Sequence, residues 1–388
     1  MREERSVSAL RKTLGLAMIL AGIGSAAGQL AKGGAPARSS QASSDSAQAS
    51  EGPRIENAKL ETRAISASLD ATLREIAATA EKPEWVGYHV DEVAGERGIC
   101  CDNDWSDRNC GTCRLEKENG ETASTSHTDG KVKLEGARQL VVLYRLEAKQ
   151  VVRIRVASED CTLDAGGLPF VWLTGVKPAD SVALLTTYVR GSDFEEHGER
   201  KIGNGALTAI ALQADASADR ALESFVTPEQ REGLRRRAAF WLGAARGKAG
   251  LIALQRMAKT DPSSDVRAQV AFALTVSHES GALDEMIRMA HDDTSSHVRG
   301  QALFWLAQKA GKKAVGTITG AIENDPDTEV KKKAVFALSQ LPKDEGVPKL
   351  IEVAQTNPNQ AVRKQAMFWL GQSNDPRALQ FFEKVLTQ

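Results

Sequence analysis

The sequence predicts a multidomain protein in which an α+β N-terminal domain is followed by an all-α, right-handed superhelical solenoid. Three observations support this fold class. A ten-residue pattern returns every 32 residues in the C-terminal half of the 388-residue chain, which is typical of stacked helical repeats. Residues 55–198 mix strand-like and helix-like periodicity. Residues 28–54 contain mostly small and polar side chains, so the sequence divides into a leader, a linker and two folded parts.

Residues 1–27 have the features of an export signal. Basic residues are followed by the apolar stretch Leu14–Ile23 and by small residues at Ser25–Ala27, a plausible cleavage site. The apolar stretch is shorter than the roughly 20 residues that span a bilayer, so we expect no stable membrane insertion after cleavage. The expected location is periplasmic or extracellular. Residues 28–54 cannot bury enough apolar surface to fold and are expected to form a disordered linker.

Residues 55–198 are predicted to form one α+β domain with antiparallel strands. Alternating apolar residues indicate a strand over 58–64, and Ser68 is a candidate N-cap for a helix that reaches about residue 81. Residues 85–90 form a second strand candidate. The clearest hairpin joins 139–147 to 150–157 through Ala148 and Lys149, because both arms are rich in β-branched residues. A further helix is expected over 179–189.

All five cysteines belong to this domain, and they are Cys100, Cys101, Cys110, Cys113 and Cys161. In an exported protein we expect disulfides, with one bridge inside the loop 98–114 and one from that loop to Cys161. Two alternatives stay open. Cys110 and Cys113 have zinc-knuckle spacing, which Cys101 and Cys161 would complete to a four-thiolate metal site, and a C-x-x-C pair can also be redox-active. The sequence cannot choose the pairing.

The segment 160–167 combines two acidic residues with a glycine pair. We expect a tight turn, in which Gly166 and Gly167 adopt positive φ and Asp164 hydrogen-bonds to the turn backbone. The alternative is a small cleft lined by Asp160 and Asp164. We know of no reaction that this spacing specifies.

The repeated pattern places apolar residues on one face of a helix. In the copy Asp265–Leu274, the residues Val266, Val270 and Leu274 recur at the helical period. The copies at 32-residue intervals are 233–242, 265–274, 297–306, 329–338 and 361–370. A second apolar segment and an Asp or Asn in the turn before each copy keep the same spacing. Each repeat is therefore two helices, and six repeats are expected over residues 199–388, the first of them degenerate.

This pattern, V-R-x-x-A-x-x-A-L preceded by a D-P turn, resembles the short HEAT-like repeats found in bacterial proteins, including phycobilisome lyases. The resemblance covers about half of the chain, and residues 55–198 resemble no family of known function. It implies that the basic residue of each motif pairs with an Asp of a neighbouring turn. The residues concerned are Arg267, Arg299 and Arg363 on the helices and Asp261, Asp293 and Asp325 in the turns.

One motif position alternates between large and small side chains, namely Trp241, Ala273, Trp305, Ala337 and Trp369. Alternation of this kind suits a packed core in which adjacent layers share volume. The alternative is a row of tryptophans on a binding surface. That interpretation predicts that the tryptophan side chains are more than about a third exposed.

The motifs of enzymes are not found in the sequence. There is no Gly-x-Ser-x-Gly, His-Glu-x-x-His or Gly-rich phosphate loop. Deoxyhypusine hydroxylases, a HEAT-repeat enzyme class, use repeated His-Glu dyads, but here His278-Glu279 is followed 32 residues later by Ala310-Gly311. A lyase activity would rest on the resemblance of the repeats alone. We therefore expect no catalytic residues and no cofactor.

Charge and repeat type together favour a protein partner. The net charge is −6 over residues 53–202 and +3 over 203–388, so neither part has the basic bias of a nucleic-acid-binding protein. We predict a non-catalytic cell-envelope scaffold whose solenoid binds a protein or peptide. The alternative is a ligand- or metal-binding sensor in the Cys-containing domain, with the solenoid as its output.

Overall fold

The structure is a computed structural model that describes residues 53–94, 109–110, 112–116, 132–133, 139–159, 161–194 and 200–387. Glu51–Gln388 form one compact unit. The predicted signal segment and nearly all of the predicted linker lie outside the described residues, and so does the predicted boundary at residue 198. In the described part of the chain, no helix has the length and apolar character needed to cross a membrane.

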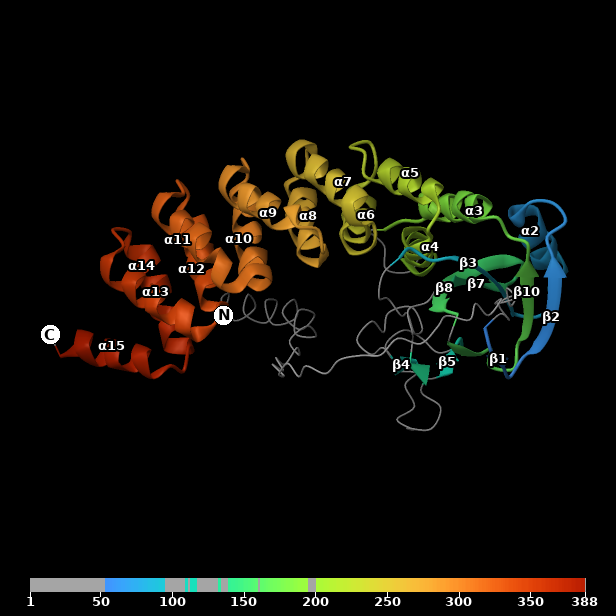
Figure 1. Ribbon diagram of the computed structural model, residues 1–388, viewed down its shortest axis with the longest axis horizontal. Helices are drawn as coiled ribbons and strands as arrows, with labels where there is room; N and C mark the ends of the chain where they lie inside the picture. The colour runs from blue at the N-terminus through green and yellow to red at the C-terminus, as the bar shows by residue number, and fades with distance from the viewer. Residues whose placement is uncertain are drawn as a thin grey trace, which may run out of the picture. The chain divides into compact units, whose positions relative to one another are not determined.

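A five-stranded sheet forms the centre of the N-terminal part (Figure 1), with the strand order β2-β10-β3-β7-β8. The strands are β2 (Lys59–Ala64), β3 (Glu84–Asp91), β7 (Gln139–Glu147), β8 (Gln150–Ser158) and β10 (Pro169–Thr174). The prediction of antiparallel strands is correct for the pairs β3–β7 and β7–β8 but wrong for β2, whose partner in this sheet is β10. That strand lies parallel to both β2 and β3, because the chain crosses over the sheet before it returns between them.

The local predictions in this part are confirmed. β7 and β8 form the expected hairpin, and Ala148 and Lys149 at its tip have φ values of 49° and 64°. Helix α2 spans Leu69–Thr79, and the side chain of Ser68 caps it by accepting from the backbone N–H of Ala71. Helix α3 spans Pro178–Gly191 and begins with the proline, as suits a residue without an N–H.

The two faces of the large sheet belong to two different cores. Val86, Tyr88 and Tyr144 face the helices, and the hydroxyl of Tyr88 lies 2.7 Å from that of Ser181 on α3. On the other face, Trp85 and Phe170 belong to a smaller core. That core includes residues of the three-stranded sheet β1-β9-β5, whose strands are Ile55–Glu56, Thr162–Asp164 and Thr112–Arg114. Both sheet faces are therefore covered. Two further short strands, β4 (Asn109–Cys110) and β6 (Val132–Lys133), pair with each other.

The glycine-rich segment after β9 forms the expected turn. Gly166 and Gly167 have φ values of 66° and 83°. The Asp164 carboxylate accepts from the backbone N–H of Gly166 at 2.9 Å and from the side-chain amide of Asn57 at 3.1 Å. Asp164 is thus used in holding the turn. Asp160, the other residue of the alternative cleft, lies outside the described residues.

Six helical hairpins follow over the described residues 200–387, and Figure 1 shows their succession. In each, the helix that carries the repeated motif, here called the motif helix, is followed by a partner helix. The motif helices are α4 (Arg200–Leu212), α6 (Glu232–Ala245), α8 (Ser264–Val276), α10 (Ser296–Ala310), α12 (Thr328–Ser339) and α14 (Gln360–Gln372). The partner helices are α5 (Ala216–Phe225), α7 (Gly247–Thr260), α9 (Gly281–Asp292), α11 (Val315–Asn324), α13 (Lys343–Thr356) and α15 (Pro376–Leu386). A 3₁₀ turn, η2 (Gly311–Ala314), precedes α11.

The sheet and the helical array share one continuous hydrophobic core. The cluster that contains Tyr88 and Ile154 of the sheet extends through α3 and α4 to Phe381 on α15. Helix α4 lies so close to β8 that a Cβ added at Gly205 would come within 2.1 Å of the carbonyl oxygen of Ile154. The sheet and α3 therefore cover the apolar end of the first repeat, the role that a capping repeat has in other solenoids.

Candidate protein-interaction surface

Buried ion pairs connect successive repeats at the motif position that the sequence singled out. Three arginines of the motif each reach the Asp of the turn that follows their own repeat, whereas Arg363 has no such ion pair among the described residues. The pairs are Arg235–Asp261 at 2.9 Å, Arg267–Asp293 at 2.8 Å and Arg299–Asp325 at 2.7 Å. All three aspartates are less than a tenth exposed. The pairing of Arg267 and Arg299 with turn aspartates that the resemblance implied is present.

Each of these arginines also stabilises the turn on its own N-terminal side. Arg267 donates to the carbonyl oxygen of Asp261 at 2.9 Å, and Arg299 to that of Asp293 at 2.8 Å. The hydrogen bonds that Arg267 and Arg299 donate to Asp293 and Asp325 raise the pKa of the two guanidinium groups. With their donors committed to protein acceptors, these guanidinium groups hold repeats together and do not form an anion-binding row.

This series of pairs is interrupted between the last two repeats. Lys331 takes the arginine position and donates to the carbonyl oxygen of Glu323 at 2.7 Å, and Asn357 takes the aspartate position. The side chain of Asn357 still accepts from the backbone N–H of Asn359, which is the N-cap residue of α14. Arg363 donates to the carbonyl oxygen of Asn357 at 2.8 Å. The junction between α12 and α14 therefore lacks the charged connection that three earlier junctions have.

The double change Lys331→Arg with Asn357→Asp is expected to create a fourth ion pair. Asn357→Asp alone should destabilise the protein, because it buries a carboxylate beside a lysine that points elsewhere. The two changes together should show a favourable coupling of at least about 1 kcal/mol. Urea unfolding of the two single variants and the double variant measures this coupling. Additive effects would contradict the prediction.

Aromatic rings of the motif helices form one continuous chain of contacts. It runs through Trp241, Phe240, Phe272, Trp305, Phe304, Phe336, Trp369 and Phe368, with neighbouring centroids 4.7–5.9 Å apart. Phe240 stacks on Phe272, and Phe304 stacks on Phe336, with interplanar angles of 14° and 3°. We call these eight residues the aromatic stripe. It extends over five consecutive motif helices.

The tryptophans do not form an exposed row. Trp241 is buried, and Trp305 and Trp369 are partly buried, so none reaches the exposure that the binding-surface interpretation predicted. The phenylalanines contribute more to the surface. Four of them are partly buried, and Phe368 is 55% exposed. The same Phe recurs every 32 residues in the sequence, but the repeat alone does not indicate that these rings, and not the neighbouring tryptophans, reach the surface.

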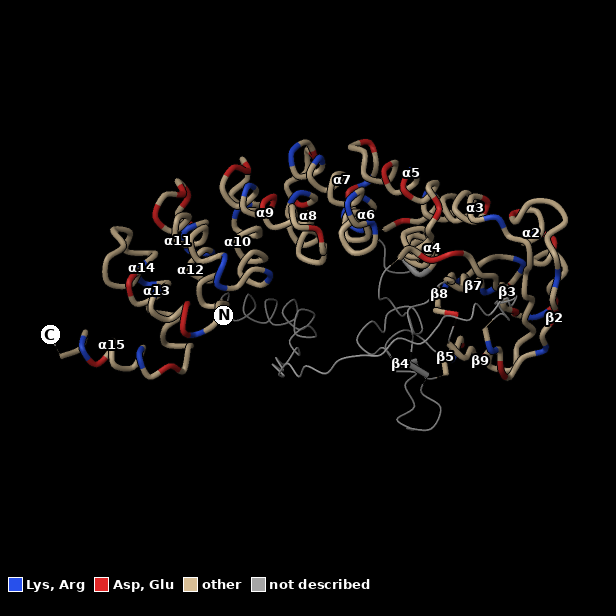
Figure 2. Tube along the Cα trace, viewed as in Figure 1, with Lys and Arg blue, Asp and Glu red and all other residues tan. Residues whose placement is uncertain are grey.

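The helices that carry the stripe are rich in basic residues. The five motif helices from α6 to α14 contain eleven Lys or Arg and three Asp or Glu, and Figure 2 shows these charges along the chain. Three of the basic residues are the paired arginines described above. The partner helices from α7 to α15 contain eight of each sign. The excess positive charge therefore belongs to the motif helices.

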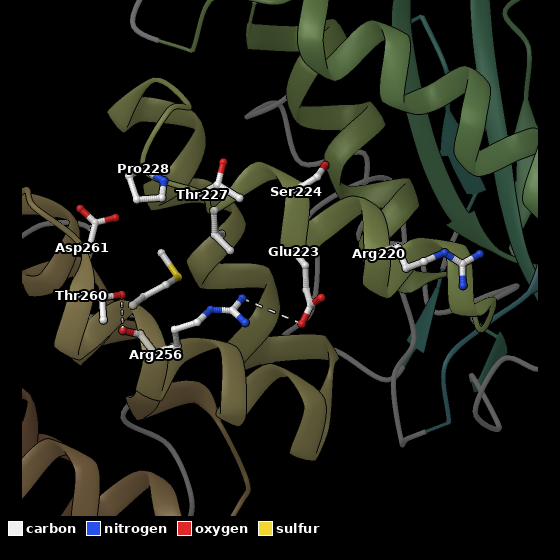
Figure 3. Close-up of a pocket in the computed structure, with 10 residues that line it drawn as sticks. Arg220, Glu223, Ser224, Thr227, Pro228, Arg256, Thr260 and Asp261 are labelled. Carbon is white, nitrogen blue, oxygen red and sulfur yellow. Dashed lines mark hydrogen bonds and ion pairs between the residues drawn. The ribbon is translucent and has the colours of Figure 1, made fainter.

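A separate cavity of about 430 Å³ lies between the partner helices α5 and α7. Figure 3 shows Arg256 and Glu223 pointing toward each other across it, and their closest atoms are 3.9 Å apart. Met257 contributes an apolar wall, and Asp261 on its rim is already paired with Arg235. Two exposed side chains in weak contact do not define a specific ligand.

The remaining candidate residues that the structure describes form no common site. Cys161 carries a buried thiol within the smaller core, so the expected bridge from the loop to Cys161 is not formed. Its surroundings are apolar, and Leu163 packs in the same cluster. Cys100, Cys101 and the side chain of Cys110 lie outside the described residues, so the pairing of the other cysteines stays a prediction. The described residues contain no group of three or more potential metal ligands.

Comparison with known proteins supports the repeat assignment. A family profile described as HEAT repeats matches residues 283–368 and 317–388, and a search of curated proteins gives no match. The chain carries HEAT-like repeats, and the matched residues all lie in its C-terminal half. Among solved structures, human deoxyhypusine hydroxylase with glycerol is 15% identical, with a TM-score of 0.28, and the match covers 53% of this chain and 90% of that one.

Two further solved structures give similar values. Kap95p with RanGDP is 18% identical, with a TM-score of 0.36, over 54% of this chain and 32% of that one. The CpcE–CpcF complex of phycocyanin lyase from a Nostoc species is 20% identical, with a TM-score of 0.28, over 53% and 80%. At such identities and scores these likenesses say nothing about activity.

Proposed function

We propose that this chain, whose C-terminal half is an array of HEAT-like repeats, is a non-catalytic scaffold that binds a protein or peptide along its motif helices. Repeat solenoids of this kind mediate protein interactions through extended surfaces. The observation that carries the proposal is the aromatic stripe. Partly exposed rings that are held in place by their neighbours can contact a partner with little loss of side-chain entropy.

The charges beside the stripe indicate the chemistry of the partner. Once the three paired arginines are set aside, the motif helices still carry more basic than acidic residues. Positive charge on an interaction surface favours and steers partners of opposite charge. We therefore propose a partner segment that combines apolar or aromatic residues with acidic ones.

Photo-crosslinking on the full chain tests which side of the array binds. A photoreactive phenylalanine analogue would replace Gln301, one turn from Phe304 on α10, and in a separate variant Ile252, which is 54% exposed on α7. Adducts to a partner protein are expected from position 301 and not from position 252. Adducts from position 252 alone would move the binding surface to the partner helices.

Substitution of Phe368 tests the contribution of the stripe. Phe368 is 55% exposed, so Phe368→Ala should cost little stability but weaken binding of the crosslinked partner by about tenfold or more. Ile252→Ala is the matched control, since it removes a side chain of nearly the same exposure from a partner helix. Binding measured by calorimetry should be unchanged in the control. Equal losses in both variants would contradict the proposal.

A location in the cell envelope belongs to the same proposal. It is supported by the basic and apolar pattern of residues 1–27. N-terminal sequencing of the protein recovered from its native cells is expected to find a mature chain that begins near residue 28. An intact residue 1 in cytosolic protein would overturn the location without affecting the binding surface.

A further inference from the structure

A second candidate site lies where the array departs from its own internal symmetry. The alternation of Trp and Ala gives the motif helices a period of 64 residues, so the junction of α12 with α14 corresponds to that of α8 with α10. The ring contacts agree with this. Phe272 and Trp305 are 4.7 Å apart, and their counterparts Phe336 and Trp369 are 4.8 Å apart.

A lysine side chain bridges α8 and α10 at their junction. The ammonium group of Lys309, one turn after Trp305, donates to the carbonyl oxygens of Thr275 and Ser277, both at 2.8 Å. These carbonyls lie at the C-terminal end of α8, where a positive charge is favoured. Burial lowers the pKa of Lys309. A long side chain thus fills the space between the two helix ends.

The corresponding side chain between α12 and α14 is too short to do this. Ser373 occupies the position of Lys309, and its hydroxyl donates to the carbonyl oxygen of Leu370 in its own helix at 2.7 Å. A cavity of about 250 Å³ lies at this junction. Leu341, Val347 and Leu350 form its apolar wall, and Trp369, Lys343 and Ser373 are among its polar residues.

The polar groups of this cavity point to a ligand that accepts hydrogen bonds. The indole N–H of Trp369 is buried and has no acceptor within the described part of the chain. A buried N–H without an acceptor costs free energy, which a bound ligand that accepts the hydrogen bond would recover. Lys343 is the one charged residue that lines the cavity; its ammonium makes a long contact of 3.5 Å with the carbonyl oxygen of Asn374 and interacts electrostatically with Asp375, which does not line the cavity. No lining residue is acidic.

We infer that the cavity between α12 and α14 binds a carboxylate carried on an aliphatic group. The carboxylate accepts from the indole N–H of Trp369 and the ammonium of Lys343, and the aliphatic part packs against Leu341, Val347 and Leu350. The size of the cavity suits one side chain or one chain terminus rather than a cofactor. This inference goes beyond the proposed function, because a small carboxylate would bind whether or not a protein covers the stripe.

Nuclear magnetic resonance of the full chain tests the site with sodium hexanoate as the probe. The chain has six tryptophans, so indole ¹⁵N labelling gives a small set of signals, and Trp369→Phe identifies the signal of Trp369. Hexanoate is expected to shift this signal in a saturable way. Hexanol should bind at least about tenfold more weakly, and hexylammonium should not bind. No saturable shift, or an equal response to hexylammonium, overturns the inference.

Two substitutions at Ser373 separate filling of the cavity from general damage. Ser373→Lys should close the junction as Lys309 does, raise the thermal midpoint and abolish the response to hexanoate. Ser373→Ala leaves the cavity open and should keep the response. If Ser373→Lys fails to fold, Lys343→Gln provides the test, since loss of the ammonium should weaken hexanoate binding about tenfold. Undiminished binding in Ser373→Lys or in Lys343→Gln overturns the inference.

Short peptides distinguish the two natural sources of such a carboxylate. A peptide that ends in leucine is compared with its C-terminal amide and with an amidated peptide that carries an internal glutamate. Binding that requires the free C-terminus assigns the site to a chain end, and binding of the amidated glutamate peptide assigns it to an acidic side chain. Failure of the photo-crosslinking at position 301 would leave these results standing, so the two proposals fail separately.

Discussion

Replacement of Arg299 by alanine is expected to lower the free energy of unfolding by about 3–5 kcal/mol. Arg299 is 8% exposed and Asp325 is 9% exposed, so the substitution leaves a carboxylate buried without its counter-ion. It also removes the donor to the carbonyl oxygen of Asp293 at 2.8 Å. The side chain of Arg299 therefore connects two turns of successive repeats, and the substitution removes both contacts. Urea unfolding followed by circular dichroism measures the loss.

Lys331→Ala is the matched control for this prediction. Lys331 occupies the same motif position in the next repeat, but its ammonium bonds to an exposed carbonyl of Glu323. Its replacement should change stability by about 0.5 kcal/mol or less. Because a repeat array can unfold in parts, hydrogen exchange on α10 and α12 should accompany the urea measurement. Similar losses of unfolding free energy in Arg299→Ala and Lys331→Ala would show that the buried ion pair contributes no more to stability than Lys331 does.

Gly205→Ala is expected to destabilise the protein by about 3 kcal/mol. The added Cβ would lie 2.1 Å from the carbonyl oxygen of Ile154, and a backbone atom of β8, which is paired with β7 along its length, cannot move aside as a flexible side chain can. Helix α4 must then shift away from β8. Because the sheet and the array share one core there, the loss should appear in the cooperative unfolding of both parts.

Gly320→Ala provides the opposite expectation within the same fold. Gly320 lies inside α11, and a Cβ added there meets nothing within 4 Å. Alanine should therefore raise stability by about 0.5–1 kcal/mol through its better helix propensity. Thermal melts of both variants give the comparison. Destabilisation by Gly320→Ala, or tolerance of Gly205→Ala, would show that the packing at these two glycines is not as described.

The helical array could be predicted closely because its determinants are local and repeated. The residues that pack, such as Val266 and Val270, lie within one helix. The turn that contains Asp293 lies a few residues before helix α10. Each copy of the motif adds independent support to the same period. The ion pairs followed from the resemblance because Arg267 and Asp293 are separated by a constant distance in sequence.

The arrangement of the N-terminal sheet could not be predicted in the same way. β2 pairs with β10 across more than a hundred residues, and no local pattern states which strand returns to which edge. The hairpin of β7 and β8 was predictable because its two arms are adjacent in sequence. The candidate sites also depend on tertiary contacts. The 64-residue alternation is visible in the sequence, but the cavity beside Trp369 is not, because it depends on Lys309 bridging one junction and Ser373 leaving the corresponding one open.

The 64-residue alternation of Trp and Ala constrains how this protein can change its length. Loss of one repeat, such as the one that carries Ala273, would bring Trp241 next to Trp305 in successive layers, and gain of an Ala repeat would leave two small side chains facing each other. Loss or gain of two repeats together preserves the match of large with small. Gene duplication in this chain should therefore proceed by pairs of hairpins, and natural length variants should differ by multiples of 64 residues.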